Sequence, residues 1–304
     1  MNLRQSKDVE IRLSYSALNL MVCERLFELM RLRNPMLLSN DSSNIHTTSG
    51  TALHIGIQNL LDGKVLESCW IDMLKEWRFD LWDDKQKKTF PKFSAALEIF
   101  QHQWNWDRYQ IVDIKGVKPT ELSVKINLGN PKHNFYARLD KVFYDPLEDM
   151  YGVIEIKTTG SNHLNLEPMW KNSDQGVGNS ICLHQIAPDR KSYYVMYIVI
   201  QFTGQYDTPR VHIFKFKKSV RDRLEWLQGL GMKYQRIVDA IDKYGLFMKN
   251  GDHCSNHYGR TCPLYGTCDN VDPEIWSPEK DSEQEKWDFE FDILSLIDEQ
   301  LRDL

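Results

Sequence analysis

The sequence of 304 residues lacks the long apolar runs and the biased composition of membrane and fibrous proteins. Its longest apolar run, YYVMYIVI from Tyr193, is far shorter than the roughly 20 residues of a membrane-spanning helix, so we expect no membrane partner. The first fourteen residues contain no apolar segment, and we therefore expect no secretory signal and a cytoplasmic protein. With 41% hydrophobic and 27% charged residues, the chain has the composition of a globular protein that buries a sizeable core.

Charge is distributed unevenly along the chain. From Asp272 onwards the chain has twelve acidic residues but only three basic ones, Lys280, Lys286 and Arg302. The remaining residues, 1–271, therefore carry a slightly positive net charge. A mildly basic body fits a polyanionic substrate, and it fits an ordinary solvated surface equally well. The acidic tail, residues 272–304, ends in FEFDILSLIDEQL, which predicts a short amphipathic helix. This helix is expected to dock on a protein partner, to shield a basic groove, or to pack on the protein itself.

Two periodicities divide the remaining chain. Residues 14–113 show mainly helical spacing of apolar residues, and residues 119–218 contain alternating or continuously apolar segments typical of strands. The strands are expected at 121–128, 135–144, 151–158, 193–202 and 210–217, with a helix at 167–186 between them. A long helix from Ser219 precedes a cysteine-rich loop, and together these form segment 219–268. The order predicts one α/β domain over residues 1–271, with a mixed, mostly antiparallel central sheet surrounded by helices.

The clearest chemical pattern is Asp140 in YARLDKVFYD followed by Glu155 and Lys157 in YGVIEIKTTG. Alternate residues of a strand share a face, so Glu155 and Lys157 point the same way, and the intervening turn DPLED brings Asp140 beside them. Two converging carboxylates suit Mg²⁺ or Mn²⁺, and a lysine beside them suits a developing phosphoryl charge. Taken alone, an acid-x-lysine pair also fits an ordinary surface ion pair.

In these residues the chain resembles the PD-(D/E)xK nucleases, particularly the RecB-like branch. The branch carries an aspartate on one strand and acid-x-lysine on the next, matched by Asp140, Glu155 and Lys157. It also has a histidine after a glycine on an early helix and a glutamate opening the preceding strand. These positions are matched by Gly50, His54 and Glu121.

One motif of the branch is only partly present. A helix beginning Q-x-x-x-Y follows the acid-x-lysine strand in the family, and here Gln175 is present while Asn179 stands in place of the tyrosine. Gln185 is a second candidate for the glutamine. Because Asn179 replaces this tyrosine, the sequence also fits an alternative function, that of a catalytically silent subunit that binds DNA or acts as a scaffold.

The resemblance implies the restriction-endonuclease-like core and metal-dependent hydrolysis of phosphodiester bonds in DNA. His54, Asp140, Glu155 and the backbone carbonyl of Ile156 would hold Mg²⁺ or Mn²⁺, and Lys157 would position the attacking water or stabilise charge. Gln175 would orient Lys157 or a phosphate. The relatives commonly process single-stranded or duplex ends, so we expect an exonuclease of DNA recombination or repair in a bacterial or phage-infected cell. Oligomeric state, cleavage polarity and strand preference are not contained in these motifs.

Cysteine usage adds a second expected site. Without a secretory signal the six cysteines are not expected to form disulfides, and Cys254, Cys262 and Cys268 cluster on a loop in the manner of metal ligands. Some RecB-like nucleases hold a 4Fe–4S cluster with one cysteine from an N-terminal helix and three from a C-terminal segment, which Cys23 and this trio match. Zinc, with His253 and His257 as further ligands, is the alternative, and it would fit a zinc-stapled interaction protein. Cys69 and Cys182 are assigned to packing.

Overall fold

The computed structural model describes residues 5–33, 45–77, 88–113, 122–160, 166–187, 190–203, 208–255, 261–266, 268 and 287–304. The chain forms two compact units, each built from separate stretches of sequence. Unit 1 comprises Met1–Ser42, Ser123–Ala137 and Leu224–Leu304, and unit 2 comprises Ser43–Leu122 and Arg138–Arg223. Among the described helices, none is both long and apolar enough to cross a membrane.

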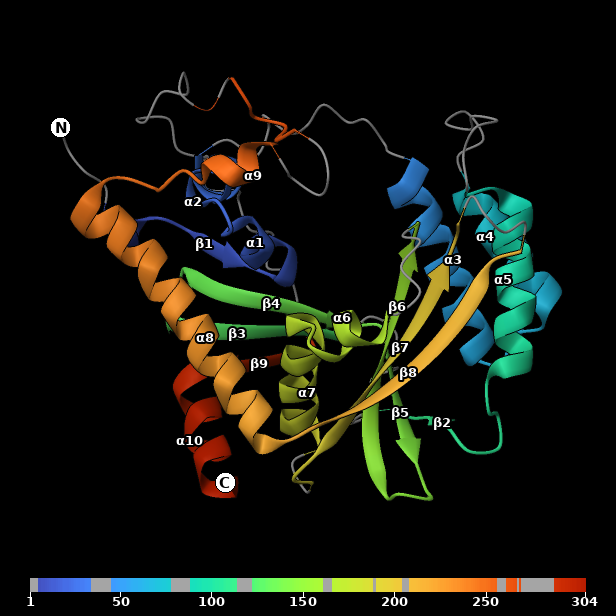
Figure 1. The fold of residues 1–304 in the computed structure, drawn as a ribbon. Helices are drawn as coiled ribbons and strands as arrows, with labels where there is room; N and C mark the ends of the chain where they lie inside the picture. The colour runs from blue at the N-terminus through green and yellow to red at the C-terminus, as the bar shows by residue number, and fades with distance from the viewer. Residues whose placement is uncertain are drawn as a thin grey trace. The chain divides into compact units, whose positions relative to one another are not determined.

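Unit 2 is organised around a five-stranded mixed sheet (Figure 1). Its strands, in spatial order, are β2 (Gln110–Ile111), β5 (Lys141–Asp145), β6 (Met150–Thr159), β7 (Tyr193–Gln201) and β8 (Arg210–Lys218). Only the central pair, β6 and β7, is parallel; the other three pairs are antiparallel. The predicted α/β fold with a mixed, mostly antiparallel sheet and surrounding helices is confirmed.

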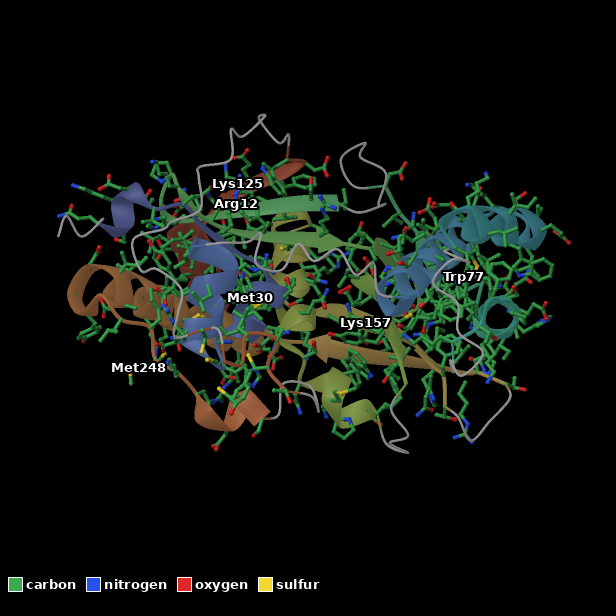
Figure 2. The ribbon with its side chains drawn as sticks, turned by 90° about the horizontal axis from the view of Figure 1, so that it is seen from above. Arg12, Met30, Trp77, Lys125, Lys157 and Met248 are labelled. Carbon is green, nitrogen blue, oxygen red and sulfur yellow. The ribbon has the colours of Figure 1, made fainter. Side chains whose placement is uncertain are left out.

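Helices cover both faces of this sheet (Figure 1). They are α3 (Ile45–Leu61), α4 (Leu66–Glu76), α5 (Phe90–Gln103), α6 (Glu167–Lys171) and α7 (Asp174–Ile186). Helices α3, α4 and α5 enclose the main apolar core with alternate residues of the strands, among them Ile154, Ile156 and Ile198. Trp77, labelled in Figure 2, packs edge-on against Phe93 within this core. Helix α7 packs on the opposite face, against β6 and β7, and this second face carries the polar residues described below.

Unit 1 contains a four-stranded sheet in the order β1 (Ile11–Leu13), β4 (His133–Leu139), β3 (Leu122–Asn130) and β9 (Phe289–Asp292). Its helices are α1 (Tyr15–Leu20), α2 (Glu24–Phe27), α8 (Val220–Asp239), α9 (Gly251–Ser255) and α10 (Ile293–Asp303), with a 3₁₀ turn at Ser6–Asp8 and π-helical segments at Glu28–Arg33 and Ala240–Tyr244. Strand β9 pairs in parallel with β3, and Leu296 of α10 is buried. The end of the acidic tail therefore packs on the protein itself, one of the three roles that the sequence allowed.

The single strand expected over 135–144 is two strands in two different sheets. Strand β4 ends at Leu139 and β5 begins at Lys141, so Asp140 occupies the junction. The carboxylate of Asp140 accepts a hydrogen bond from the backbone N–H of Ile156 at 3.0 Å, which ties the junction to β6. The chain thus changes sheets at the residue that the sequence marked for chemistry.

Candidate active site

The register of β5 against β6 brings Asp140 and Glu155 together. Lys141 pairs with Ile154 in this antiparallel ladder, which places the preceding Asp140 opposite Glu155. The two carboxyl groups lie close enough for that of Asp140 to raise the pKa of Glu155. The alternation of strand residues therefore does what the sequence predicted and converges two carboxyls on one sheet face.

Glu155 is buried, with 1% of its surface exposed. Its Oε1 accepts from Lys157 Nζ at 3.3 Å, and its Oε2 accepts from Asn179 Nδ2 at 2.8 Å. Burial raises the pKa of Glu155 to about 8; the charge of Lys157 opposes this shift, and the nearby carboxyl of Asp140 adds to it. Without a further positive charge, the pair of carboxyls thus retains a proton in neutral solution.

His54 on α3 lies at the same point of β6. Its Nε2 donates to the carbonyl oxygen of Ile156 at 2.7 Å, and its Nδ1 lies 3.6 Å from Asp140 Oδ2. Gly50, one turn earlier on α3, lies beside Thr158, so the helix passes close to the strand here. The backbone of Ile156 thus meets Asp140 through its N–H and His54 through its carbonyl.

Helix α7 supplies the amide group that holds Glu155. Asn179 is fully buried and stands at the position where the resemblance noted from the sequence would place a tyrosine. The helix approaches the sheet closely at Gly176, where an added Cβ would lie 2.4 Å from the hydroxyl oxygen of Tyr197. Tyr197 is paired with Glu155 across β6 and β7 and is fully buried. Neither residue was assigned a site role from the sequence, although Asn179 follows Gln175 by four residues and so shares its helix face.

The remaining predicted residues occupy varied positions. Lys157, labelled in Figure 2, keeps 26% of its side chain exposed and so reaches solvent from the buried carboxyl pair. Gln175 is half-buried at the start of α7, and among the described residues no hydrogen bond joins it to Asp140, Glu155 or Lys157. Gln185 lies near the other end of α7. Glu121 lies outside the described residues.

The donor set has the chemistry of a divalent-cation site: two carboxyls, one imidazole and one backbone carbonyl. Nε2 of His54 is hydrogen-bonded to the carbonyl oxygen of Ile156 and Nδ1 lies 3.6 Å from Asp140 Oδ2, so the imidazole, the carbonyl and this carboxyl are close neighbours. Within the part of the chain that the structure describes, however, no three His, Cys, Asp or Glu side chains are already spaced as ligands of one ion. The donors fit such an ion chemically, and holding it requires the His54 hydrogen bond to open.

The four predicted cysteine ligands converge in unit 1. All are free thiols, with Cys23 buried and Cys254, Cys262 and Cys268 half-buried. Burial raises the pKa of the Cys262 thiol, and the proximity of the thiols of Cys254, Cys23 and Cys268 raises it further. The backbone N–H of Cys262 also donates to the carbonyl oxygen of Cys254 at 2.9 Å. Two segments separated by more than 200 residues thus bring their thiols near one another, although among the described residues no three His, Cys, Asp or Glu side chains are arranged as ligands of one metal ion.

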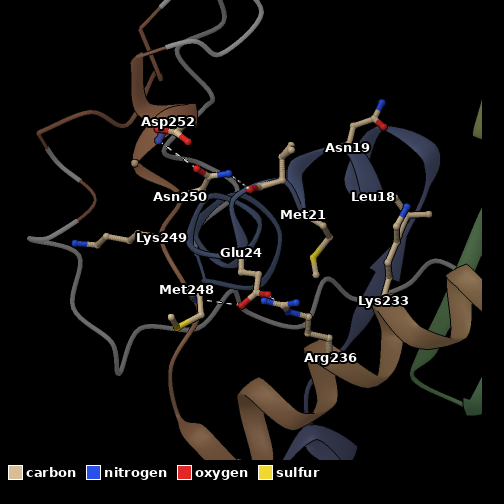
Figure 3. A pocket seen from close by; sticks show the side chains of 12 residues that line it. Leu18, Asn19, Met21, Glu24, Lys233, Arg236, Met248, Lys249, Asn250 and Asp252 are labelled. Carbon is tan, nitrogen blue, oxygen red and sulfur yellow. Dashed lines mark hydrogen bonds and ion pairs between the residues drawn. The ribbon is translucent and has the colours of Figure 1, made fainter. Parts of the chain in front are cut away.

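Polar contacts hold these two segments in place. The guanidinium of Arg25 donates to the carbonyl oxygen of Cys268 at 3.0 and 3.2 Å, and Asn250 Nδ2 donates to the carbonyl oxygen of Val22 at 2.9 Å. A cavity of about 780 Å³ lies beside them (Figure 3). In its wall the buried carboxylate of Glu24 pairs with Arg236 and accepts from the backbone N–H of Met248. His253 lies in the described part of this segment, whereas His257 lies outside it.

Comparisons with known proteins give a likeness of fold. No protein-family model matches the chain, and no curated protein matches it significantly. A crystal structure from Eubacterium rectale, described as a "Putative exonuclease", superposes with a TM-score of 0.50 at 11% identity, over 84% of this chain and 91% of that chain. A structure described as SSO0001 matches with a TM-score of 0.28 at 12% identity, over 64% of this chain and 76% of that chain. The chain therefore shares its fold with a protein described as an exonuclease.

Proposed function

We propose that this protein is a metal-dependent DNA nuclease that hydrolyses phosphodiester bonds, with an exonuclease as the preferred form. The observation that carries the proposal is the meeting of Asp140, Glu155, Lys157 and His54 around Ile156 of β6. The likeness of fold to a protein described as an exonuclease supports it at the level of architecture. DNA processing in recombination or repair is the setting that we propose for this activity.

His54, Asp140, Glu155 and the carbonyl of Ile156 would hold Mg²⁺ or Mn²⁺. The chemistry that the ion supplies when bound is polarisation of the scissile phosphate and a lower pKa for a nearby water. His54 serves as a ligand through Nε2 only if its ring proton resides on Nδ1, the nitrogen that faces Asp140. The histidine also makes the donor set less hard, which favours Mn²⁺.

Three side chains of this chain would complete the site. Lys157 reaches solvent from the carboxyl pair, so its ammonium positions the attacking water or stabilises the charge that develops on the phosphate. Asn179 fixes the rotamer of Glu155 through its 2.8 Å hydrogen bond. Gln175, one turn earlier on the same helix face, would orient Lys157 or a phosphate.

Cleavage of end-labelled linear DNA, single-stranded and duplex, tests the proposal. Wild-type protein should shorten the DNA with Mn²⁺ or Mg²⁺ and should be inactive in EDTA. Asp140→Asn and Glu155→Gln keep side-chain size, remove a negative charge from the donor set, and should lower the rate at least a hundredfold. Wild-type protein that binds DNA but never cleaves it with any divalent ion would instead establish the silent DNA-binding subunit.

We also propose that Cys23, Cys254, Cys262 and Cys268 hold a 4Fe–4S cluster. The convergence of four free thiols in unit 1 supports this assignment. Iron and zinc analysis of anaerobically purified protein tests it, with about four irons per chain expected. If the analysis instead finds one zinc per chain, the four cysteines form a structural zinc site and not an iron–sulfur cluster. If neither metal is found, both assignments are refuted.

A further inference from the structure

The sheet face that carries Glu155 and Lys157 continues across unit 2 to β8. Two rows of paired residues cross the three strands: Lys157–Val199–His212 and Thr159–Gln201–Arg210. Directly paired residues point to the same side of a sheet, so His212 and Arg210 share the face of Lys157. Adjacent strands lie about 4.8 Å apart, which places His212 about 10 Å from Lys157.

An aromatic ladder runs along β8 on this face. The rings of His212 and Phe214 are parallel within 5° with centroids 5.7 Å apart, and those of Phe214 and Phe216 are parallel within 14° at 6.2 Å. Phe216 is buried beside Tyr197, which is itself packed against Trp170. His212 and Phe214 are only half-buried, so the ladder has one closed end and one end that reaches solvent.

The open end of the ladder is flanked by a cation. Arg210 is exposed, and His212 Nε2 is hydrogen-bonded to Gln201 Oε1 at 3.1 Å. Burial lowers the pKa of His212, and the charge of Arg210 lowers it further, so the ring is neutral at physiological pH. Along the described strands β6, β7 and β8, Glu155 is the one acid on this face, and it is buried. Proteins bind single-stranded nucleic acids by stacking bases on exposed aromatic rings next to basic side chains, and the His212 ring beside Arg210 is such a combination.

We propose that β8 carries the binding site for an unpaired part of the DNA substrate, with a base stacked on the open end of the His212–Phe214 ladder and a backbone phosphate bound by Arg210. This inference rests on the proposed nuclease function, because it extends the site at Asp140 and Glu155. Bases inside a duplex have both faces covered by their neighbours, so the ladder takes only single-stranded DNA or a frayed end. The spacing of about 10 Å keeps the stacked base on the same strand as the scissile phosphate.

Binding of short oligonucleotides in EDTA, where cleavage is suppressed, tests this inference. The probes are a single strand carrying 2-aminopurine, whose fluorescence is quenched by stacking, and its duplex. His212→Leu keeps apolar volume but removes the ring at the open end of the ladder, on which the base would stack. It should weaken single-strand binding about tenfold, abolish the protein-dependent quenching and leave duplex binding unchanged. Phe214→Leu, which removes the ring behind His212, is the second variant if His212→Leu fails to fold, and it should reduce both binding and quenching.

Arg210→Ala tests the phosphate contact separately. It should reduce the slope of log affinity against log salt by about 0.7, the value for one phosphate of a single strand. Lys217→Ala is the matched control, because Lys217 is exposed on the same strand but its position alternates to the opposite face; its salt slope and quenching should equal those of wild type.

The outcomes separate this inference from the proposed function. Wild-type affinity and quenching in folded His212→Leu, or equal losses for single strand and duplex, would overturn the β8 site. If such a variant behaves like wild type while wild type cleaves DNA, only the β8 site fails. If wild type shows ladder-dependent quenching but never cleaves with Mg²⁺ or Mn²⁺, the nuclease function fails and the β8 site remains.

Discussion

Replacing Asn179 by alanine tests whether the amide on α7 is what holds Glu155. Asn179 is fully buried, and its Nδ2 donates to Glu155 Oε2 at 2.8 Å. The variant removes this donor and leaves the carboxyl oxygen without it, in surroundings where water does not replace the lost hydrogen bond. We expect two consequences, one for folding stability and one for catalysis.

The magnitudes follow from burial. Leaving a buried hydrogen-bonding atom unsatisfied costs about 1–3 kcal/mol. Asn179→Ala should therefore lower the free energy of unfolding by about 2 kcal/mol. Because Glu155 loses the group that fixes its rotamer, cleavage should fall by a factor of about 10–100, the usual effect of removing a residue that orients a metal ligand.

Urea unfolding in EDTA and cleavage with Mn²⁺ measure the two effects. Asn172→Ala is the control: Asn172 is exposed, and its Nδ2 donates only locally to the carbonyl oxygen of Pro168 at 3.2 Å. The control should stay within about 0.5 kcal/mol of wild type and retain full activity. If Asn179→Ala matches the control in both measurements, the reasoning about Glu155 is refuted.

Three further predictions concern the two units. Burial lowers the pKa of Lys88 to about 8, so wild-type stability rises between pH 8 and 10.5, where the unfolded chain binds more protons. Relative to wild type, Lys88→Met should therefore be more stable at pH 7 than at pH 10.5 by roughly 3 kcal/mol, and an equal difference at both pH values would contradict this. Gly152→Ala should cost about 1–3 kcal/mol, because the added Cβ would lie 2.3 Å from the ring of Phe143, whereas Gly229→Ala on α8 meets no atom within 4 Å and should stabilise by about 0.5–1 kcal/mol in thermal unfolding. Cys23→Ser should lose most of its iron and melt at a lower temperature, and unchanged iron would exclude Cys23 as a ligand.

The local sequence pattern was sufficient to predict much of the strand arrangement in unit 2. The alternation around Glu155 and Lys157 and the turn after Asp145 were sufficient to predict two adjacent antiparallel strands with Asp140 near Glu155. The same rules treated residues 135–144 as one strand, because nothing local shows that the chain changes sheets at Asp140. That change depends on the hydrogen bond from Ile156, which is a tertiary contact.

Contacts between distant segments were beyond the reach of sequence pattern. Strand β1 has three residues and β9 has four, too few for a periodicity, and β9 pairs with β3 across more than 160 residues. The role of Asn179 was likewise hidden, because only the register of α7 on β6 shows which helix residue meets Glu155. The aromatic ladder on β8 was hidden as well, because it emerges only from the pairing and twist of the folded strands.

The most direct test of the central claim is the cleavage rate of Lys157→Ala with Mn²⁺. The side chain of Lys157 is 26% exposed and ends at solvent, so thermal unfolding is measured on the same protein, and a loss of rate in a stably folded variant reports on chemistry. We predict loss of detectable cleavage together with unchanged thermal unfolding, while Lys217→Ala cleaves normally. Cleavage at the wild-type rate by purified Lys157→Ala would contradict the assignment of this site.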